Sequence, residues 1–131
     1  MHPDGTGAMN GVVLYIDDSP DNIFLLQRLF KRRCPDVQLH TTMTGRDGIR
    51  AAIDDQPTLI LLDNHLPDAN GEQVLRQLAV NPATAAIPVV ILSGDSNPVT
   101  INELLAAGAA DFLVKPFDIH KLLAIIGSYL H

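Results

Sequence analysis

Short apolar runs recur along this chain and are separated by segments of helical periodicity, a pattern that few folds can accommodate. Three of these runs, VVLYI, LILL and VVIL, are continuously apolar, which is typical of strands buried on both faces of a parallel sheet. A fourth run, VQLHT, alternates between apolar and polar residues and indicates an edge strand. The predicted strands are Val12–Ile16, Val37–Thr41, Leu59–Leu62, Val89–Leu92 and Phe112–Val114.

The intervening segments repeat apolar residues at spacings of three and four, as a helix with one buried face does. Ser19-Pro20 predicts the start of the first helix and Gly108 the end of the fourth. Right-handed crossovers then place helices on both faces of one sheet, so we predict a doubly wound α/β domain of the form (βα)5. The stripes are Ile23, Leu26 and Phe30; Ile49, Ala52 and Ile53; Val74, Leu75 and Leu78; Ile101, Leu104 and Leu105; and Ile119, Leu122, Leu123 and Ile126.

Composition limits the size, the location and the partners of the chain. With 131 residues, 47% of them hydrophobic and 18% charged, we expect one globular domain over residues 11–131, preceded by a tail or cloning remnant over residues 1–10. The net charge of −6 argues against sequence-independent binding to nucleic acid or to an anionic membrane. One cysteine, Cys34, excludes a disulfide framework, and no signal peptide or membrane-spanning run is evident, so we expect a cytoplasmic protein.

Polar residues follow four of the predicted strands at the point where each strand ends. Asp17 and Asp18 follow the first strand, Asp63 the third, Ser93 the fourth and Lys115 the fifth. The carboxyl ends of parallel strands form the ligand-binding edge of such a sheet, so we expect these side chains to meet there.

Three carboxylates in one place need more positive charge than Lys115 supplies. Two carboxylates about 4 Å apart repel by roughly 4 kcal/mol at an effective dielectric of 20. Mg²⁺ suits such a site because it accepts carboxylate oxygens and keeps positions free for phosphate oxygens. A metal and a lysine together would draw a phosphoryl group toward a carboxylate nucleophile, which predicts an aspartyl phosphate.

These motifs resemble the receiver domain of two-component response regulators. The resemblance implies a flavodoxin-like fold with strand order 2-1-3-4-5. The opening LYIDDSPDN is more similar to receivers attached to hybrid sensor histidine kinases than to those of DNA-binding regulators. The matching motifs are Asp17-Asp18, Asp63 with Leu66-Pro67, Ser93-Gly94 and Lys115-Pro116-Phe117.

The resemblance also implies a role for each site residue. Asp63 is expected to accept a phosphoryl group, and Lys115 and Ser93 are expected to bind phosphoryl oxygens. The expected ligands of Mg²⁺, or of Mn²⁺ in its place, are Asp17, Asp18, Asp63 and the backbone carbonyl of His65.

A second group of residues is expected to control the response. The resemblance implies that Phe112 occupies the switch position, and that Ser93 and Phe112 together reshape the face formed by the fourth helix, fifth strand and fifth helix. The side chains of His65 and Asp95 are expected to tune hydrolysis of the phosphoaspartate. The Lys115-Pro116 peptide bond is expected to be cis.

The predicted function is a phosphorylation-controlled signalling switch without conventional substrate turnover, in which Asp63 is phosphorylated and dephosphorylates itself. The expected partners are a sensor histidine kinase or phosphotransfer protein and a downstream target or fused output domain; a phosphorylation-dependent dimer is left open. The alternatives are a receiver excised from a hybrid kinase, a phosphorylation-independent pseudo-receiver, a flavodoxin-like cofactor binder and a phosphatase with an aspartate nucleophile. The acidic first loop counts against a flavin phosphate, and acids on different strands count against the phosphatase.

Overall fold

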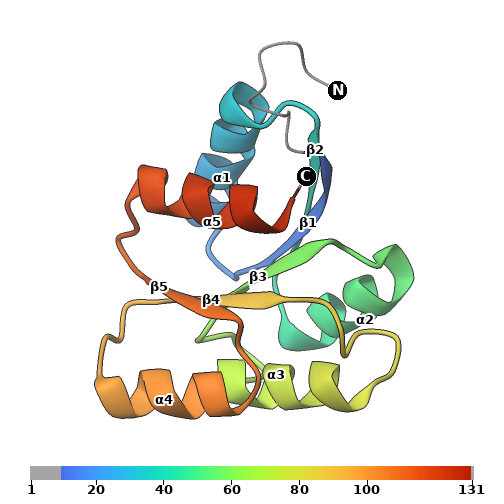
Figure 1. Cartoon of the computed structure of the whole chain (residues 1–131), viewed down its shortest axis with the longest axis vertical. Helices are drawn as coiled ribbons and strands as arrows, with labels where there is room; N and C mark the ends of the chain where they lie inside the picture. The colour runs from blue at the N-terminus through green and yellow to red at the C-terminus, as the bar shows by residue number, and fades with distance from the viewer. Residues whose placement is uncertain (1–9, 131) are drawn as a thin grey trace.

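The computed structural model describes residues 10–130 and has the predicted alternation of strands and helices (Figure 1). Each predicted strand is present and is longer by one residue at one end. The predicted tail lies outside the described residues except for Asn10. The strands are β1 (Gly11–Ile16), β2 (Val37–Thr42), β3 (Leu59–Asp63), β4 (Val89–Ser93) and β5 (Asp111–Val114), and the helices are α1 (Pro20–Arg33), α2 (Gly45–Asp55), α3 (Gly71–Val80), α4 (Pro98–Ala106) and α5 (Ile119–Tyr129).

The five strands form one parallel sheet in the order β2-β1-β3-β4-β5. This order confirms the predicted flavodoxin-like fold, and β2 lies at an edge, as its alternating sequence indicates. Figure 1 shows α1 and α5 on one side of the sheet, with α3 and α4 on the other.

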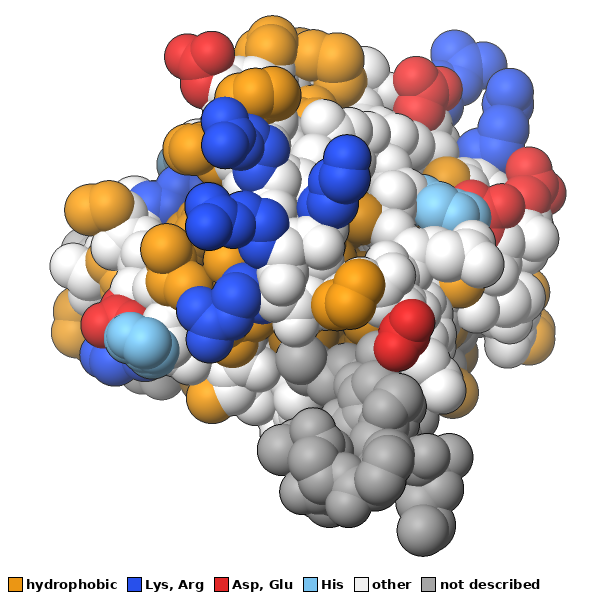
Figure 2. Space-filling model, turned by 90° about the horizontal axis from the view of Figure 1, so that it is seen from above, with side chains coloured by type: hydrophobic (Ala, Val, Ile, Leu, Met, Phe, Trp, Pro, Cys, Tyr) orange, Lys and Arg blue, Asp and Glu red, His pale blue; other side chains and the backbone are white. Residues whose placement is uncertain are grey.

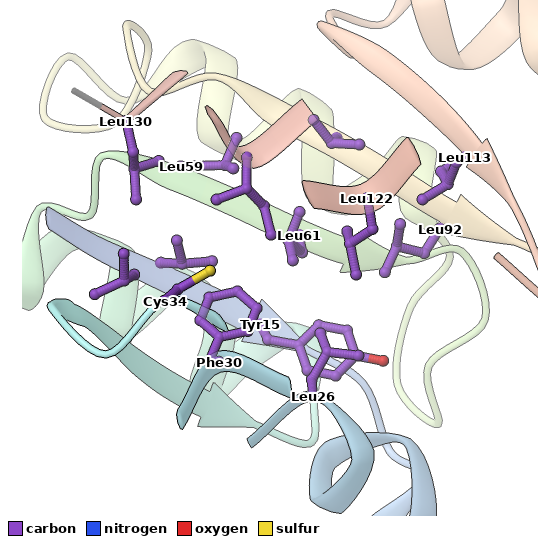
Figure 3. Packing of buried hydrophobic residues seen from close by; sticks show 14 residues of the cluster. Tyr15, Leu26, Phe30, Cys34, Leu59, Leu61, Leu92, Leu113, Leu122 and Leu130 are labelled. Carbon is purple, nitrogen blue, oxygen red and sulfur yellow. The ribbon is translucent and has the colours of Figure 1, made fainter. Parts of the chain in front are cut away.

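Each face of the sheet has its own apolar core because successive strand residues point to opposite faces. The first core joins β1 and its neighbours to α1 and α5; Figure 3 shows Leu26 and Phe30 of α1 packed in it with Leu122 of α5. The second core lies under α2, α3 and α4 and includes Ala52, Leu75 and Leu104. Both faces are thus covered, which explains the continuously apolar strands.

Local capping signals define the helix ends as predicted. The Ser19 side chain accepts the backbone N–H of Asn22 at 3.2 Å, and Pro20 begins α1. Three basic residues, Lys31 to Arg33, lie in the last turn of α1, where the helix dipole favours positive charge. Gly108, with φ of +117°, follows the end of α4.

The helical stripes predict too wide a buried face in three places. Ile53, Leu105 and Ile119 were grouped with core residues, but their side chains are 38%, 44% and 48% exposed. A helix laid on a sheet contacts it over a narrow arc, so residues at the edge of a stripe reach solvent although the spacing includes them. Among residues 10–130, none of the helices is both long enough and apolar enough to cross a bilayer.

The pairing of the strands places the candidate site residues next to one another at the carboxyl edge of the sheet. Ile16 at the end of β1 is paired with Leu62 of β3, so the residues that follow them, Asp17 and Asp63, lie side by side. The ladder continues past β4 and β5, where the Lys115 N–H donates to the Ser93 carbonyl at 2.7 Å. The Lys115-Pro116 peptide bond is cis, as expected.

Candidate functional site

Three carboxylates from two strand ends gather at the carboxyl edge of the sheet. Oxygens of Asp17, Asp18 and Asp63 lie within 4.8 Å of one another. Asp17 is 1% exposed and Asp63 is 7% exposed, whereas Asp18 is open to solvent. At an effective dielectric of 20, two unit charges at this separation repel by roughly 3 kcal/mol. The acidic cluster expected from the sequence is therefore present.

Lys115 joins the two buried carboxylates. Its Nζ lies 3.1 Å from Asp63 Oδ1 and 3.2 Å from Asp17 Oδ2. Asp17 and Lys115 are 98 residues apart in the chain, so only the folded sheet brings them into contact. The lysine supplies one positive charge to three carboxylates, which leaves the cluster negative.

Asp17 is more fully hydrogen-bonded than the sequence suggests. Its Oδ1 accepts the backbone N–H of Ser19 at 2.9 Å. Its Oδ2 accepts the side chain of Asn22 at 3.2 Å, Lys115 and the hydroxyl of Tyr15. Sequence reasoning treated Tyr15 only as a strand residue. The spacing of two that puts Tyr15 and Asp17 on one side of the strand is the signal that could have found the contact.

The two buried carboxylates have opposite pKa shifts. Burial raises the pKa of Asp63, and Asp17 and Asp18 add to this rise, while the ion pair with Lys115 only partly offsets it. Burial also raises the pKa of Asp17, but hydrogen bonds from Tyr15 and Ser19, with Lys115 and Asn22, outweigh it and the pKa ends below its usual value. Asp63 is thus the less stabilised anion of the pair.

The donor set fits a hard divalent cation. All the converging side-chain ligands are carboxylate oxygens, two of the three residues are buried, and the cluster keeps a negative charge after Lys115 is counted. Mg²⁺ and Mn²⁺ prefer such oxygen ligands to the nitrogen and sulfur ligands of zinc sites.

Ser93 and Phe112 lie on the face of the sheet opposite to Asp17 and Asp63, the carboxylates that Lys115 contacts. Strand alternation places Ser93 with Ile91 of β4, whose side chain belongs to the core under α4. Phe112 pairs with Ile91 and packs, half-buried, against the same core. Ser93 is fully buried and its Oγ accepts the N–H of Asp95 at 3.1 Å. The two expected switch residues therefore share one face on neighbouring strands.

His65 lies in the loop that follows β3, and Asp95 lies in the loop that follows β4. The His65 side chain is exposed, and its backbone bridges to Asn70 within the β3–α3 loop. The Asp95 carboxylate accepts the N–H of Asn97 at 2.8 Å and the hydroxyl of Thr100 at 3.1 Å. Asp95 is thus held against the start of α4.

A groove of about 490 Å³ lies beside the acidic cluster, between α1 and the segment that leads into α5. Its lining is mainly apolar, and Lys115 borders both the groove and the carboxylates. Figure 2 looks onto the end of the molecule where α1 finishes and shows Lys and Arg side chains gathered among hydrophobic ones. The groove is lined by Asn22, Leu25, Leu26, Leu29, Lys115, Pro116, Phe117 and Ile119.

Solved structures share this fold. The chemotaxis response regulator CheY4 of Vibrio cholerae superposes with a TM-score of 0.83 at 23% identity, over 92% of this chain and 99% of that one. The receiver domain of the sensor histidine kinase PA1611 of Pseudomonas aeruginosa, whose structure has a magnesium ion coordinated in its active site cleft, gives a TM-score of 0.82 at 22% identity, over 92% of this chain and 97% of that one.

Sequence comparison gives the family. The model of the response regulator receiver domain matches residues 13–127. Protein PilH of Pseudomonas aeruginosa is 32% identical over 118 residues, which are 90% of this chain and 96% of PilH. The response regulator PleD of Caulobacter vibrioides is 34% identical over 120 residues, which are 92% of this chain but 26% of PleD. The chain therefore belongs to the family of response regulator receiver domains of two-component signalling.

Proposed function

We propose that this receiver domain is a switch controlled by phosphorylation of Asp63, with Mg²⁺ as cofactor and a histidine kinase or phosphotransfer protein as donor. The observation that carries the proposal is the contact of Lys115 Nζ with both Asp63 and Asp17, inside a cluster of three carboxylates. A buried carboxylate beside a lysine and a cation site is a nucleophile suited to phosphoryl transfer.

The Mg²⁺ ion would be held by Asp17, Asp18 and Asp63, with the backbone carbonyl of His65 as a further ligand. Mn²⁺ is an alternative ion for the same ligands. When bound, the ion neutralises the carboxylates and binds phosphoryl oxygens. The acidic cluster supports this assignment, since Lys115 alone leaves it negative.

The chain's own residues account for the transfer itself. An Asp63 carboxylate oxygen forms a bond to phosphorus as the bond between phosphorus and the donor's histidine nitrogen breaks, which gives an acyl phosphate. Burial, with the neighbouring carboxylates, raises the pKa of Asp63, and an anion that is poorly stabilised in this way is a better nucleophile. Lys115, already 3.1 Å from Asp63, would bind one of the new phosphoryl oxygens. Attack of water on phosphorus later releases inorganic phosphate and restores the carboxylate.

The response would pass through Ser93 and Phe112. A phosphoryl group adds about −1.5 to −2 of charge and three acceptor oxygens next to β4. Movement of the Ser93 hydroxyl toward these oxygens would free space for the half-buried Phe112 ring and reshape the face of α4, β5 and α5. The location of Ser93 and Phe112 on one face of the sheet supports this mechanism. A downstream target or a fused output domain would bind the reshaped face.

The apolar groove between α1 and α5 supports a protein as the phosphoryl donor. Leu25 and Ile119 line it and are 60% and 48% exposed, so a protein seated in the groove would cover apolar side chains from both helices. Because Lys115 borders the groove, a protein seated there would present its phosphohistidine next to Asp63. The match to the receiver-domain family supports a cytoplasmic location.

Incubation of the chain with Mg²⁺ and acetyl phosphate tests the proposal. Intact-mass spectrometry should show the gain of one phosphoryl group, and chelation of the metal should prevent it. The Asp63→Asn variant should show no gain, while Asp36→Asn, a matched change of an exposed aspartate, should behave like the wild type. A wild-type protein that takes up no phosphoryl group would indicate the phosphorylation-independent pseudo-receiver.

The lifetime of the phosphoaspartate tests the roles proposed for His65 and Asp95. His65 is exposed and free to meet incoming water, whereas the Asp95 carboxylate is bound to the start of α4. We therefore expect the His65→Ala variant to change the dephosphorylation rate more than Asp95→Asn. If exchange of both residues leaves the rate as it is in the wild type, neither residue tunes hydrolysis.

A further inference from the structure

Tyr15 links the apolar core to the acidic cluster. Its side chain is completely buried in β1, beside Leu26 and Phe30 of α1 (Figure 3). In Figure 3 the hydroxyl oxygen projects from the end of the packed ring, away from the body of the cluster. This hydroxyl donates to Asp17 Oδ2. A buried tyrosine normally pairs its hydroxyl with some acceptor, and here the acceptor is a carboxylate of the proposed metal site.

The donors to Asp17 Oδ2 differ in charge. Tyr15 and Asn22 are neutral donors, whereas Lys115 is a cation that lies 3.1 Å from Asp63 as well. An ammonium group between the two carboxylates competes with a divalent cation for the same negative charge. A neutral donor stabilises the Asp17 carboxylate without repelling that cation.

Building on the proposed function, we infer that Tyr15 is a positioning residue for the metal and phosphoryl site. Its hydroxyl holds Asp17 in place, so that Lys115 can leave Asp17 for a phosphoryl group on Asp63 without leaving a buried anion short of donors. Asp17 is 1% exposed, so water cannot readily replace a lost hydrogen bond. Without the hydroxyl, Asn22 remains as a neutral side-chain donor to Asp17 Oδ2, so the carboxylate relies more on Lys115. The lysine then stays where the divalent cation should bind.

Direct metal binding tests this inference. Mn²⁺ affinity is measured by electron paramagnetic resonance of the free ion for the wild type, Tyr15→Phe and the control Tyr129→Phe, which alters the other tyrosine of the chain. Phenylalanine keeps the buried ring, so the core stays filled. We expect the dissociation constant of Tyr15→Phe to rise about tenfold, as for other residues that orient metal ligands, and that of Tyr129→Phe to stay at the wild-type value. Equal affinities of the wild type and Tyr15→Phe would overturn the inference.

A double-variant cycle shows whether Tyr15 acts through Asp17. Urea unfolding without metal is compared for Tyr15→Phe in the wild-type background and in Asp17→Ala. We expect Tyr15→Phe to lower the unfolding midpoint in the wild-type background only, because Asp17→Ala removes the acceptor. Equal losses in both backgrounds would show that the Tyr15 hydroxyl does not act through Asp17. If the wild type bound no Mn²⁺, the proposed function would fail, whereas this cycle would still decide the role of Tyr15 toward Asp17.

Discussion

The two buried aspartates differ in the number of hydrogen bonds that they accept and in the direction of their pKa shifts. Asp17 accepts four donors, and its pKa is below the usual value although burial opposes this. Asp63 accepts the Lys115 ammonium, and burial together with the neighbouring carboxylates keeps its pKa above the usual value. The same side chain in the same cluster is therefore a well-stabilised anion at one position and a less stabilised one at the other.

This difference predicts that Asp63→Asn stabilises the metal-free protein. The raised pKa means that the native state resists ionisation of Asp63, so wild-type stability is lost as the pH rises through that pKa. Asparagine does not ionise, so the Asp63→Asn variant keeps its stability as the pH rises. Urea unfolding in the presence of a chelator should give a higher midpoint for Asp63→Asn at neutral pH, with a smaller difference in acid. A lower midpoint at neutral pH would mean that the ion pair with Lys115 outweighs burial.

Among the secondary-structure elements, the loop between β3 and α3 is joined to α2 by a carboxylate that caps the start of this helix. Asp68 accepts the backbone N–H groups of Gly45 at 2.8 Å and of Arg46 at 3.0 Å, at the start of α2. The loop that carries His65 is thereby fixed to the helix that packs against β1 and β2. Gly48 in α2 approaches β1 so closely that an added Cβ would clash with the side chain of Ile16, so the glycine lets α2 pack tightly on this strand.

We expect Asp68→Ala to lower the stability of the protein at neutral pH. The two backbone bonds hold the pKa of Asp68 below its usual value of 3.8, so its contribution is present above that pH and disappears as the pH falls through the depressed pKa. Thermal unfolding of Asp68→Ala and wild type should therefore differ at neutral pH and converge in strong acid. Asp36→Ala, at an exposed position, serves as the control and should match the wild type at neutral pH. A difference that persists in strong acid would exclude the charged cap as its cause.

For the molecule as a whole, the site exists only in the folded chain. Asp17, Asp63 and Lys115 come from three parallel strands, and the unfolded chain does not hold them together. A cation that binds this site therefore binds the native state and must stabilise it.

Addition of Mg²⁺ should raise the unfolding temperature, and chelation should reverse the rise. At one hundred times the dissociation constant, the expected gain is about 2.7 kcal/mol. The control is sodium chloride at the same ionic strength, because screening of the net charge of −6 also affects stability. Asp18→Asn should show a much smaller rise with Mg²⁺. An equal rise with sodium chloride would show screening and not binding.

The sequence alone was sufficient to predict the layered architecture and most of the site. Continuously apolar strands require cover on both faces, and parallel strands place their carboxyl ends at one edge, so Asp17, Asp18, Asp63 and Lys115 could be brought together from strand assignments. The Ser19-Pro20 and Gly108 signals worked because helix capping depends on nearby residues.

Other features depended on contacts between distant elements. The spacing of Ile53, Leu105 and Ile119 does not show how wide an arc of each helix the sheet covers, and they face solvent. No local pattern indicates that Asp68 caps α2, 22 to 23 residues earlier in the chain. The Tyr15 hydroxyl reaches Asp17 because the α1 core fixes the direction of the ring, and the residue pattern shows only that the two share a side. Periodicity and capping thus predict the frame and its polar edge, because both depend on nearby residues. Only the tertiary packing decides which neighbours each carboxylate has and, through them, which of the two buried anions is better stabilised.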